Sequence, residues 1–125
     1  MSDPNFLILY VDNPTASVTF YKNLLGRPPV EASETFAMFA LASGVMLGLW
    51  SKHAVEPPAA AAGGGAEIAF SVDTDKTVDA IADDWKSDGI AILQPPVRMD
   101  FGYTFVAQDP DGHRLRVFAE SAPAK

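Results

Sequence analysis

Apolar and polar residues alternate along several short segments of the chain, and this pattern predicts a duplicated fold. Residues 6–12 match 67–73, and residues 44–50 match 112–118, in both alternation and residue type. Alternation with a period of two is typical of a strand that has one buried face. Because self-similarity of this kind marks repeated structural units, we expect two copies of one module.

A helix is predicted after the first strand of each copy. In the first copy, Asn13 offers an N-cap, a proline follows at the first helical position, and Gly26 supplies a stop. In the second copy, Thr74 or the next residue is the cap, and Gly89 ends the helix. Apolar residues recur at helical spacing up to Trp85, so this tryptophan is expected in the core.

Strand-like runs follow each helix and complete the modules. They cover residues 30–31, 36–41 and 45–50 in the first copy, and 91–93, 103–108 and 114–119 in the second. The order of elements is therefore β-α-β-β-β, twice. We expect an α+β fold built from two tandem βαβββ modules.

The two modules are predicted to belong to a single domain that spans residues 1–125. Module 1 covers about 4–50 and module 2 about 66–120. Each module is too small to bury a sizeable core alone, so the two are expected to share one. Residues 51–65 join them and are rich in Pro, Ala and Gly. This segment has little apolar surface to bury and is predicted to be a mobile linker.

Strand alternation also assigns each residue to a face of its sheet. One face is uniformly apolar, as at Leu7, Leu9 and Val11, and is expected to pack under the helices. The other face mixes aromatic, charged and small residues: Phe6, Ile8, Tyr10, Met46, Gly48, Trp50, Glu67, Ala69, Ser71, Arg114, Arg116 and Phe118. Buried charges are costly unless paired. This second face is therefore expected to be a concave, ligand-binding surface.

Composition and charge limit the kinds of partner that the protein is expected to bind. The chain has 125 residues and a net charge of −7, from 9 basic and 16 acidic residues. An acidic balance argues against nucleic acid and against an anionic membrane surface. There is no cysteine, which excludes disulfides and thiolate chemistry. We find no signal sequence and no apolar run near the ~20 residues of a membrane span, so a cytoplasmic protein is expected.

The order of these features resembles a known family. Duplicated βαβββ modules, a Val-Asp after the first strand, the helix end at 20–26 and the Asp-Pro-Asp-Gly turn at 109–112 occur together. This combination resembles the vicinal oxygen chelate superfamily, the glyoxalase, bleomycin-resistance and extradiol-dioxygenase group. The resemblance covers nearly the whole chain. It implies that the two modules curl a mixed sheet into a cup, usually within a homodimer.

The resemblance also identifies where a metal would be bound in this family. The positions that match the family's metal ligands are occupied by Phe6, Gly48, Glu67 and Arg116. Of these, only Glu67 suits a divalent metal, and His53 and His113 fall at other positions. Because a zinc or iron site needs about three protein ligands, we expect no metal and no other cofactor. Metal-dependent glyoxalase or dioxygenase chemistry is correspondingly not expected.

A narrower resemblance points to a function. Residues 47–51 and 109–117 resemble the phenazine-resistance proteins of this superfamily. The similarity implies metal-free binding of a planar aromatic compound, such as a phenazine-like antibiotic, without catalysis. The alternative is an enzyme of the same fold, a lyase, isomerase or dioxygenase, that is metal-dependent or uses Glu67 as general base.

Individual residues carry two interpretations each. Trp50 can stack on a ligand or pack in a dimer interface. Glu67 and Arg116 can form an ion pair in place of a metal, or Arg116 or Arg114 can bind a ligand carboxylate. Gly102 either lets the backbone approach a ligand closely or marks an ordinary bend. The predicted ligand-binding residues are Phe6, Tyr10, Met46, Gly48, Trp50, Glu67, Phe101, Tyr103, Arg114, Arg116 and Phe118.

Overall fold

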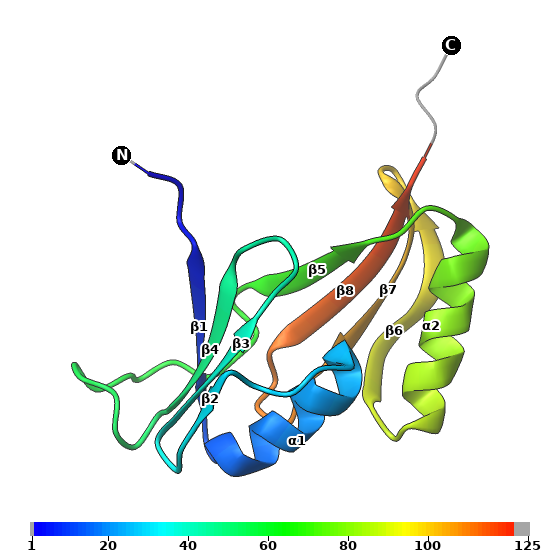
Figure 1. Ribbon diagram of the computed structural model, residues 1–125. Helices are drawn as coiled ribbons and strands as arrows, with labels where there is room; N and C mark the ends of the chain where they lie inside the picture. Colours follow the sequence, from blue (N-terminus) through cyan, green and yellow to red (C-terminus); the bar gives the residue numbers. More distant parts are fainter. Residues whose placement is uncertain (1, 122–125) are drawn as a thin grey trace. The chain divides into compact units, whose positions relative to one another are not determined.

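The computed structural model describes residues 2–121 and has the predicted order of elements (Figure 1). The first module comprises β1 (Phe6–Val11), α1 (Pro14–Leu25), β2 (Glu31–Ala32), β3 (Phe36–Ala40) and β4 (Met46–Ser51). The second comprises β5 (Glu67–Ser71), α2 (Asp75–Ser87), β6 (Ala91–Met99), β7 (Gly102–Gln108) and β8 (Arg114–Glu120). The predicted α+β fold of two tandem βαβββ modules is confirmed. The chain divides between Ala61 and Ala62 into two compact units, unit 1 and unit 2.

Each unit contains one four-stranded mixed sheet. The strand order is β1-β4-β3-β2 in unit 1 and β5-β8-β7-β6 in unit 2. In both sheets the first strand of the module runs parallel to the last, and the remaining pairs are antiparallel. Equivalent strands therefore occupy equivalent places in the two sheets, as the internal repeat predicts.

The helix caps form at the predicted residues, except that the C-cap of α2 is Asp88, one residue before Gly89. Asn13 Oδ1 accepts hydrogen bonds from the backbone N–H groups of Thr15 and Ala16, at 3.1 and 3.3 Å. Helix α1 ends at Gly26, which is left-handed with φ of 71°. In α2, the cap is Thr74, whose hydroxyl accepts from the Thr77 N–H at 3.1 Å. Between residues 2 and 121, neither helix has the length and apolar character that a membrane crossing needs.

Each helix packs on one face of the sheet in its own unit. Helix α1 contacts β2, β3 and β4, and α2 contacts β6, β7 and β8. In unit 2, the Trp85 ring meets those of Phe70 and Phe105 edge to face, with centroids 5.9 and 5.4 Å apart. Trp85 therefore packs against the core from α2, as predicted, although its own side chain is only half-buried. In unit 1, Leu7 is 39% exposed although it was expected under the helix, because β1 is the edge strand and α1 lies over the others.

The predicted linker is shorter than expected at its start. Ser51 belongs to β4, the Lys52 N–H donates to the Val11 carbonyl at 2.8 Å, and Val55 is buried. Near its other end, Gly63 lies against the 109–113 turn of unit 2, where an added Cβ would be 2.8 Å from backbone atoms. Both ends of the segment are therefore part of the folded units.

Strand β6 is longer than predicted. It was expected to stop at Leu93, yet it continues through Pro95 and Pro96 to Met99. Its pairing with β7 shifts register between Ile92 and Gln94, and again between Gln94 and Val97. Because β6 is the edge strand of its sheet, residues without an N–H group are tolerated there.

Candidate functional site

The face of the unit 1 sheet opposite α1 is mostly apolar, and we call it the open face of unit 1. On β1, β3 and β4 it consists of Phe6, Ile8, Tyr10, Phe36, Met38, Ala40, Met46, Gly48 and Trp50, and the edge strand β2 adds one carboxylate, Glu31. Strand pairing places Tyr10 beside Trp50, and Trp50 beside Phe36. Phe6, Ile8 and Tyr10 are between 40% and 49% exposed. Contiguous exposed apolar side chains of this kind mark an interaction surface.

Phe36 is a residue of this face that the sequence analysis missed, together with Met38 and Ala40 of the same strand. Its ring meets the Trp50 indole edge to face, with centroids 6.2 Å apart and planes at 89°. A Cβ added at Gly48 would lie 3.2 Å from the same ring and 3.4 Å from Ile8. The Phe36 ring therefore fills the space above Gly48. The aromatic surface of this face is built around Trp50, with Phe36 holding the indole in place.

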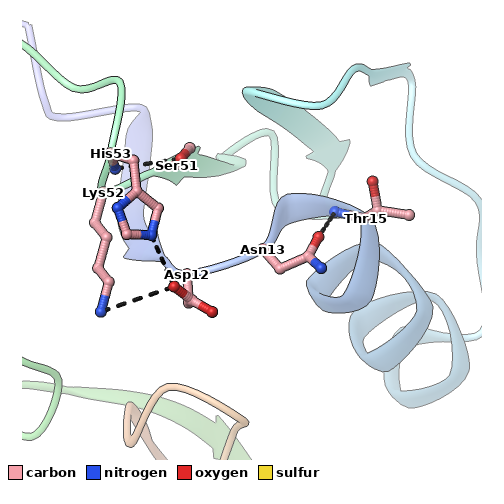
Figure 2. Close-up of polar contacts among 6 residues, drawn as sticks. All are labelled: Asp12, Asn13, Thr15, Ser51, Lys52 and His53. Carbon is pink, nitrogen blue, oxygen red and sulfur yellow. Dashed lines mark hydrogen bonds and ion pairs between the residues drawn. The ribbon is translucent and has the colours of Figure 1, made fainter.

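Polar groups at the end of β1 are engaged with one another, as Figure 2 shows. His53 Nε2 lies 2.8 Å from Asp12 Oδ1, and Lys52 Nζ lies 4.0 Å from the same oxygen. The His53 backbone N–H donates to Ser51 Oγ at 3.2 Å. The hydrogen bond to His53 is the main cause that lowers the pKa of Asp12. His53 is not a residue of the open face, in agreement with the sequence analysis.

Glu67 and Arg116 form a bidentate ion pair in unit 2, on the face of the sheet opposite α2. We call this face the open face of unit 2; it carries Glu67, Ala69, Ser71, Thr104, Val106, Arg114, Arg116 and Phe118. Arg116 Nε donates to Glu67 Oε1 at 2.7 Å, and Nη2 donates to Oε2 at 3.1 Å. The predicted ion pair is confirmed. It is a parallel fork, the strong geometry for this kind of pair.

Two further groups hold the Arg116 guanidinium. Its Nη1 donates to Thr104 Oγ1 at 3.1 Å, and the Thr104 hydroxyl donates to the Val117 carbonyl at 2.9 Å. The guanidinium carbon lies 5.8 Å from the Phe101 ring centroid, which is a cation–π contact. Phe101 in turn meets Phe118 edge to face at 6.0 Å. Thr104 was not predicted, because its role depends on the strand opposite rather than on its own neighbours.

The electrostatics of the pair make a prediction about pH. The hydrogen bonds from Arg116 are the main cause that lowers the pKa of Glu67 below its ordinary value of 4.5. A carboxyl of this kind stabilises the fold above its ordinary pKa, and the contribution is lost as pH falls through the lowered pKa. We expect Glu67→Gln to lose about 1 kcal/mol of stability near neutral pH, because the pair is partly solvent-screened.

That loss should disappear in acid. Urea unfolding measured from neutral pH to below the ordinary glutamate pKa tests this, since protonated Glu67 no longer differs in charge from glutamine. Glu120→Gln removes an exposed carboxyl from the end of β8, the strand that carries Arg116, and is the control. A stability difference for Glu67→Gln that does not change with pH would contradict the assignment.

Tyr103 is a correction to the predicted set of ligand-binding residues. It lies on the helix side of the sheet, where its hydroxyl donates to Asp79 of α2 at 2.7 Å. This hydrogen bond is the main cause that raises the pKa of Tyr103. The Arg98 guanidinium carbon lies 5.2 Å from the Tyr103 ring centroid. The same guanidinium forms an ion pair with Asp75 of α2. Tyr103 therefore fastens α2 to the sheet.

The residues at the family's metal-ligand positions do not fit a metal. Both carboxylate oxygens of Glu67 accept from the Arg116 guanidinium, which is itself a cation. The matching positions in unit 1, Phe6 and Gly48, have no donor side chain. Within residues 2–121, no three His, Asp or Glu side chains are grouped so that they could hold an ion. Protein zinc and iron sites use about three such donors.

Known proteins are similar to this chain along most of its length. The sequence model of the Glyoxalase/Bleomycin resistance protein/Dioxygenase superfamily matches residues 4–117. The phenazine antibiotic resistance protein EhpR of Enterobacter agglomerans is 32% identical over 117 residues. That alignment covers 91% of this chain and 89% of EhpR.

Solved structures share the fold. The solution structure of protein ATC0852 from Agrobacterium tumefaciens is 58% identical, with a TM-score of 0.90. It matches 98% of this chain and 100% of that protein. A glyoxalase-related enzyme from Fulvimarina pelagi is 20% identical, with a TM-score of 0.84, over 96% of this chain and 89% of the enzyme. The second likeness concerns the fold alone.

Proposed function

The chain belongs to the glyoxalase/bleomycin resistance protein/dioxygenase superfamily, and from this membership we propose that it binds and sequesters a planar aromatic small molecule. The proposed ligand class is a phenazine-like antibiotic, and the proposed role is resistance. This is supported by similarity to a phenazine antibiotic resistance protein over nine tenths of the chain. Binding is proposed to need no metal and to involve no catalysis.

The observation that carries this proposal is the aromatic surface around Trp50. Tyr10, Trp50 and Phe36 lie side by side on three neighbouring strands, and Phe36 holds the indole at right angles to its own ring. A planar ligand can stack on an indole in an offset arrangement, which contributes ~0.5–1.5 kcal/mol beyond the area buried. Ordered aromatic groups also lose little side-chain entropy on binding.

The metal-free part of the proposal makes its own prediction. Protein purified without chelators is expected to contain far less than one metal ion per chain, because Arg116 already occupies both oxygens of Glu67. Elemental analysis measures this directly. About one zinc, nickel, iron or manganese ion per chain would contradict the proposal and would favour a metal-dependent enzyme instead.

An enzyme that uses Glu67 as general base is disfavoured by the same geometry. A general base works best when its pKa lies near the working pH. The pKa of Glu67 is lowered, chiefly by Arg116, so the carboxylate is a weaker base than an ordinary glutamate. Its two oxygens are also already hydrogen-bonded. Binding without chemistry therefore agrees better with this site.

Ligand titration followed by intrinsic fluorescence tests the proposal. The chain has two tryptophans, so Trp85→Phe leaves Trp50 as the only indole reporter. Adding phenazine-1-carboxylate to this variant is expected to quench the emission in a saturable way, because the ligand stacks on that indole. No saturable change with any planar aromatic antibiotic would contradict the proposed function.

A further inference from the structure

The open face of unit 1 is rich in aromatic rings, and none of the residues that make it up is basic. Tyr10, Trp50 and Phe36 lie side by side across β1, β4 and β3. The basic residue that follows β4 in the chain, Lys52, lies 4.0 Å from Asp12 and therefore has a counter-charge. The faces of aromatic rings carry partial negative charge and attract cations, indole most strongly. The electrostatic character of this face therefore favours a positively charged ligand.

Glu31 is the charged residue of the open face of unit 1. It lies on the edge strand β2 opposite Met38, and Met38 lies opposite Gly48 in the middle of the face. The next residue of β2, Ala32, faces the other way and lines a pocket against α1. The Glu31 side chain is exposed, and no basic side chain of residues 2–121 forms an ion pair with it. A carboxylate thus borders the aromatic surface on its β2 side.

We propose that the open face of unit 1 selects planar aromatic cations, with Trp50 in contact with the charged ring and Glu31 as its counter-charge. This inference rests on the proposed function and specifies the charge of its ligand. Neighbouring strands lie about 4.8 Å apart, and residues two apart along a strand about 6.8 Å, so roughly 12 Å separate the two backbone positions. A three-ring ligand stacked on the indole spans much of that distance, and the glutamate side chain reaches toward it. The net charge of −7 also attracts cations to the protein as a whole.

Two compounds with the same three rings and one methyl group test the charge preference. 5-Methylphenazinium is a permanent cation, whereas 1-methylphenazine is uncharged at neutral pH. Calorimetric titration in the dark is expected to show about tenfold tighter binding of the cation, because it adds a cation–π contact and a partly screened ion pair. The anion phenazine-1-carboxylate should bind more weakly than either. The chain has no cysteine, so an oxidising phenazinium finds no thiol to modify.

Glu31→Gln removes the charge of this side chain and keeps its length. The variant is expected to bind the cation about threefold more weakly and the uncharged phenazine as tightly as the parent does. Glu34→Gln is the matched control, because it changes the net charge equally but lines the pocket against α1 with Thr15 and Thr19. Its tenfold preference should persist. Added salt should reduce only the share due to Glu31, since an exposed ion pair is screened.

Trp50→Leu tests the aromatic part of the preference. Leucine keeps an apolar side chain but has no ring to attract a cation, so the ratio of the two affinities is expected to fall to about threefold. Trp50→Phe retains a ring and should keep more of the ratio. The double variant Glu31→Gln/Trp50→Leu should bind the two phenazines about equally. Circular dichroism of each variant checks that the fold is unchanged.

The outcomes separate this inference from the proposed function. If the parent binds the two methyl compounds equally well, or binds the carboxylate most tightly, the cation preference is wrong and the proposed aromatic binding stands. An equal loss in Glu34→Gln would show that only net charge matters, and would overturn the role of Glu31. A preference that survives the double variant would place charge recognition outside this face and overturn the inference. If none of the three phenazines binds, the proposed function fails, and the inference fails with it.

Discussion

Replacing Trp50 with alanine is expected to weaken the binding of planar aromatic ligands by about tenfold or more. The stack on the indole contributes ~0.5–1.5 kcal/mol beyond buried area, and the lost apolar contact adds to it. A loss of 1.4 kcal/mol corresponds to a factor of about ten in affinity. The change also removes the edge-to-face partner of Phe36, so the remaining aromatic ring is less well held.

Calorimetric titration is the right measurement for Trp50→Ala, because the variant lacks the fluorescent reporter. Trp85→Phe is the matched control: it changes the other tryptophan, which packs between Phe70 and Phe105 in the core of unit 2. Its affinity is expected to stay close to that of the parent. If Trp50→Ala binds as well as the parent, the indole does not contact the ligand, and its alternative interpretation as an interface residue gains support.

Gly102→Ala is expected to destabilise the protein by about 3 kcal/mol or more. Gly102 has φ of 151°, and an added Cβ would lie 2.0 Å from the Ala119 carbonyl oxygen and 2.9 Å from Glu120 Cα. Backbone strain costs ~1–3 kcal/mol, and overpacking adds ~1–3 kcal/mol when the backbone must shift. Gly102 therefore lets its own backbone lie close to the neighbouring strand β8.

Gly89→Ala is the comparison that separates the cost of backbone strain from the cost of a steric clash with a neighbouring strand. Gly89 also has a positive φ, 83°, but an added Cβ would meet no atom within 4 Å. We expect a loss of about 1–2 kcal/mol there, from the left-handed conformation alone. Denaturant unfolding of both variants gives the comparison. Equal losses at the two glycines would show that contact with β8 contributes nothing.

Local signals explain why the elements could be predicted. The helix starts at Asn13 and Thr74 depend on side chains that reach N–H groups two or three residues away. The end of α1 depends on one left-handed glycine, Gly26. Strand alternation is equally local, and it predicts Glu67 and Arg116 on one face, in agreement with the pairing of β5 and β8. Contacts between residues this close together in the chain can be predicted from the amino-acid sequence.

Contacts between strands were the part that could not be predicted. The Phe36 ring covers Gly48 because β3 and β4 pair in one particular register, which no local pattern specifies. Thr104 meets Arg116 because β7 takes up a fixed register against β8, and Tyr103 meets Asp79 because α2 packs on β7. The prolines of β6 are compatible with a strand only because strand order places β6 at an edge.

The Glu67–Arg116 fork also constrains how this sequence can change over time. A carboxylate at position 116 would put a like charge on the strand next to that of Glu67, and loss of Glu67 would leave a partly buried guanidinium without its counter-charge. Either single substitution lowers stability before a second one can compensate. We therefore expect the two positions to change together, because a carboxylate gained at position 116 alone would cost stability.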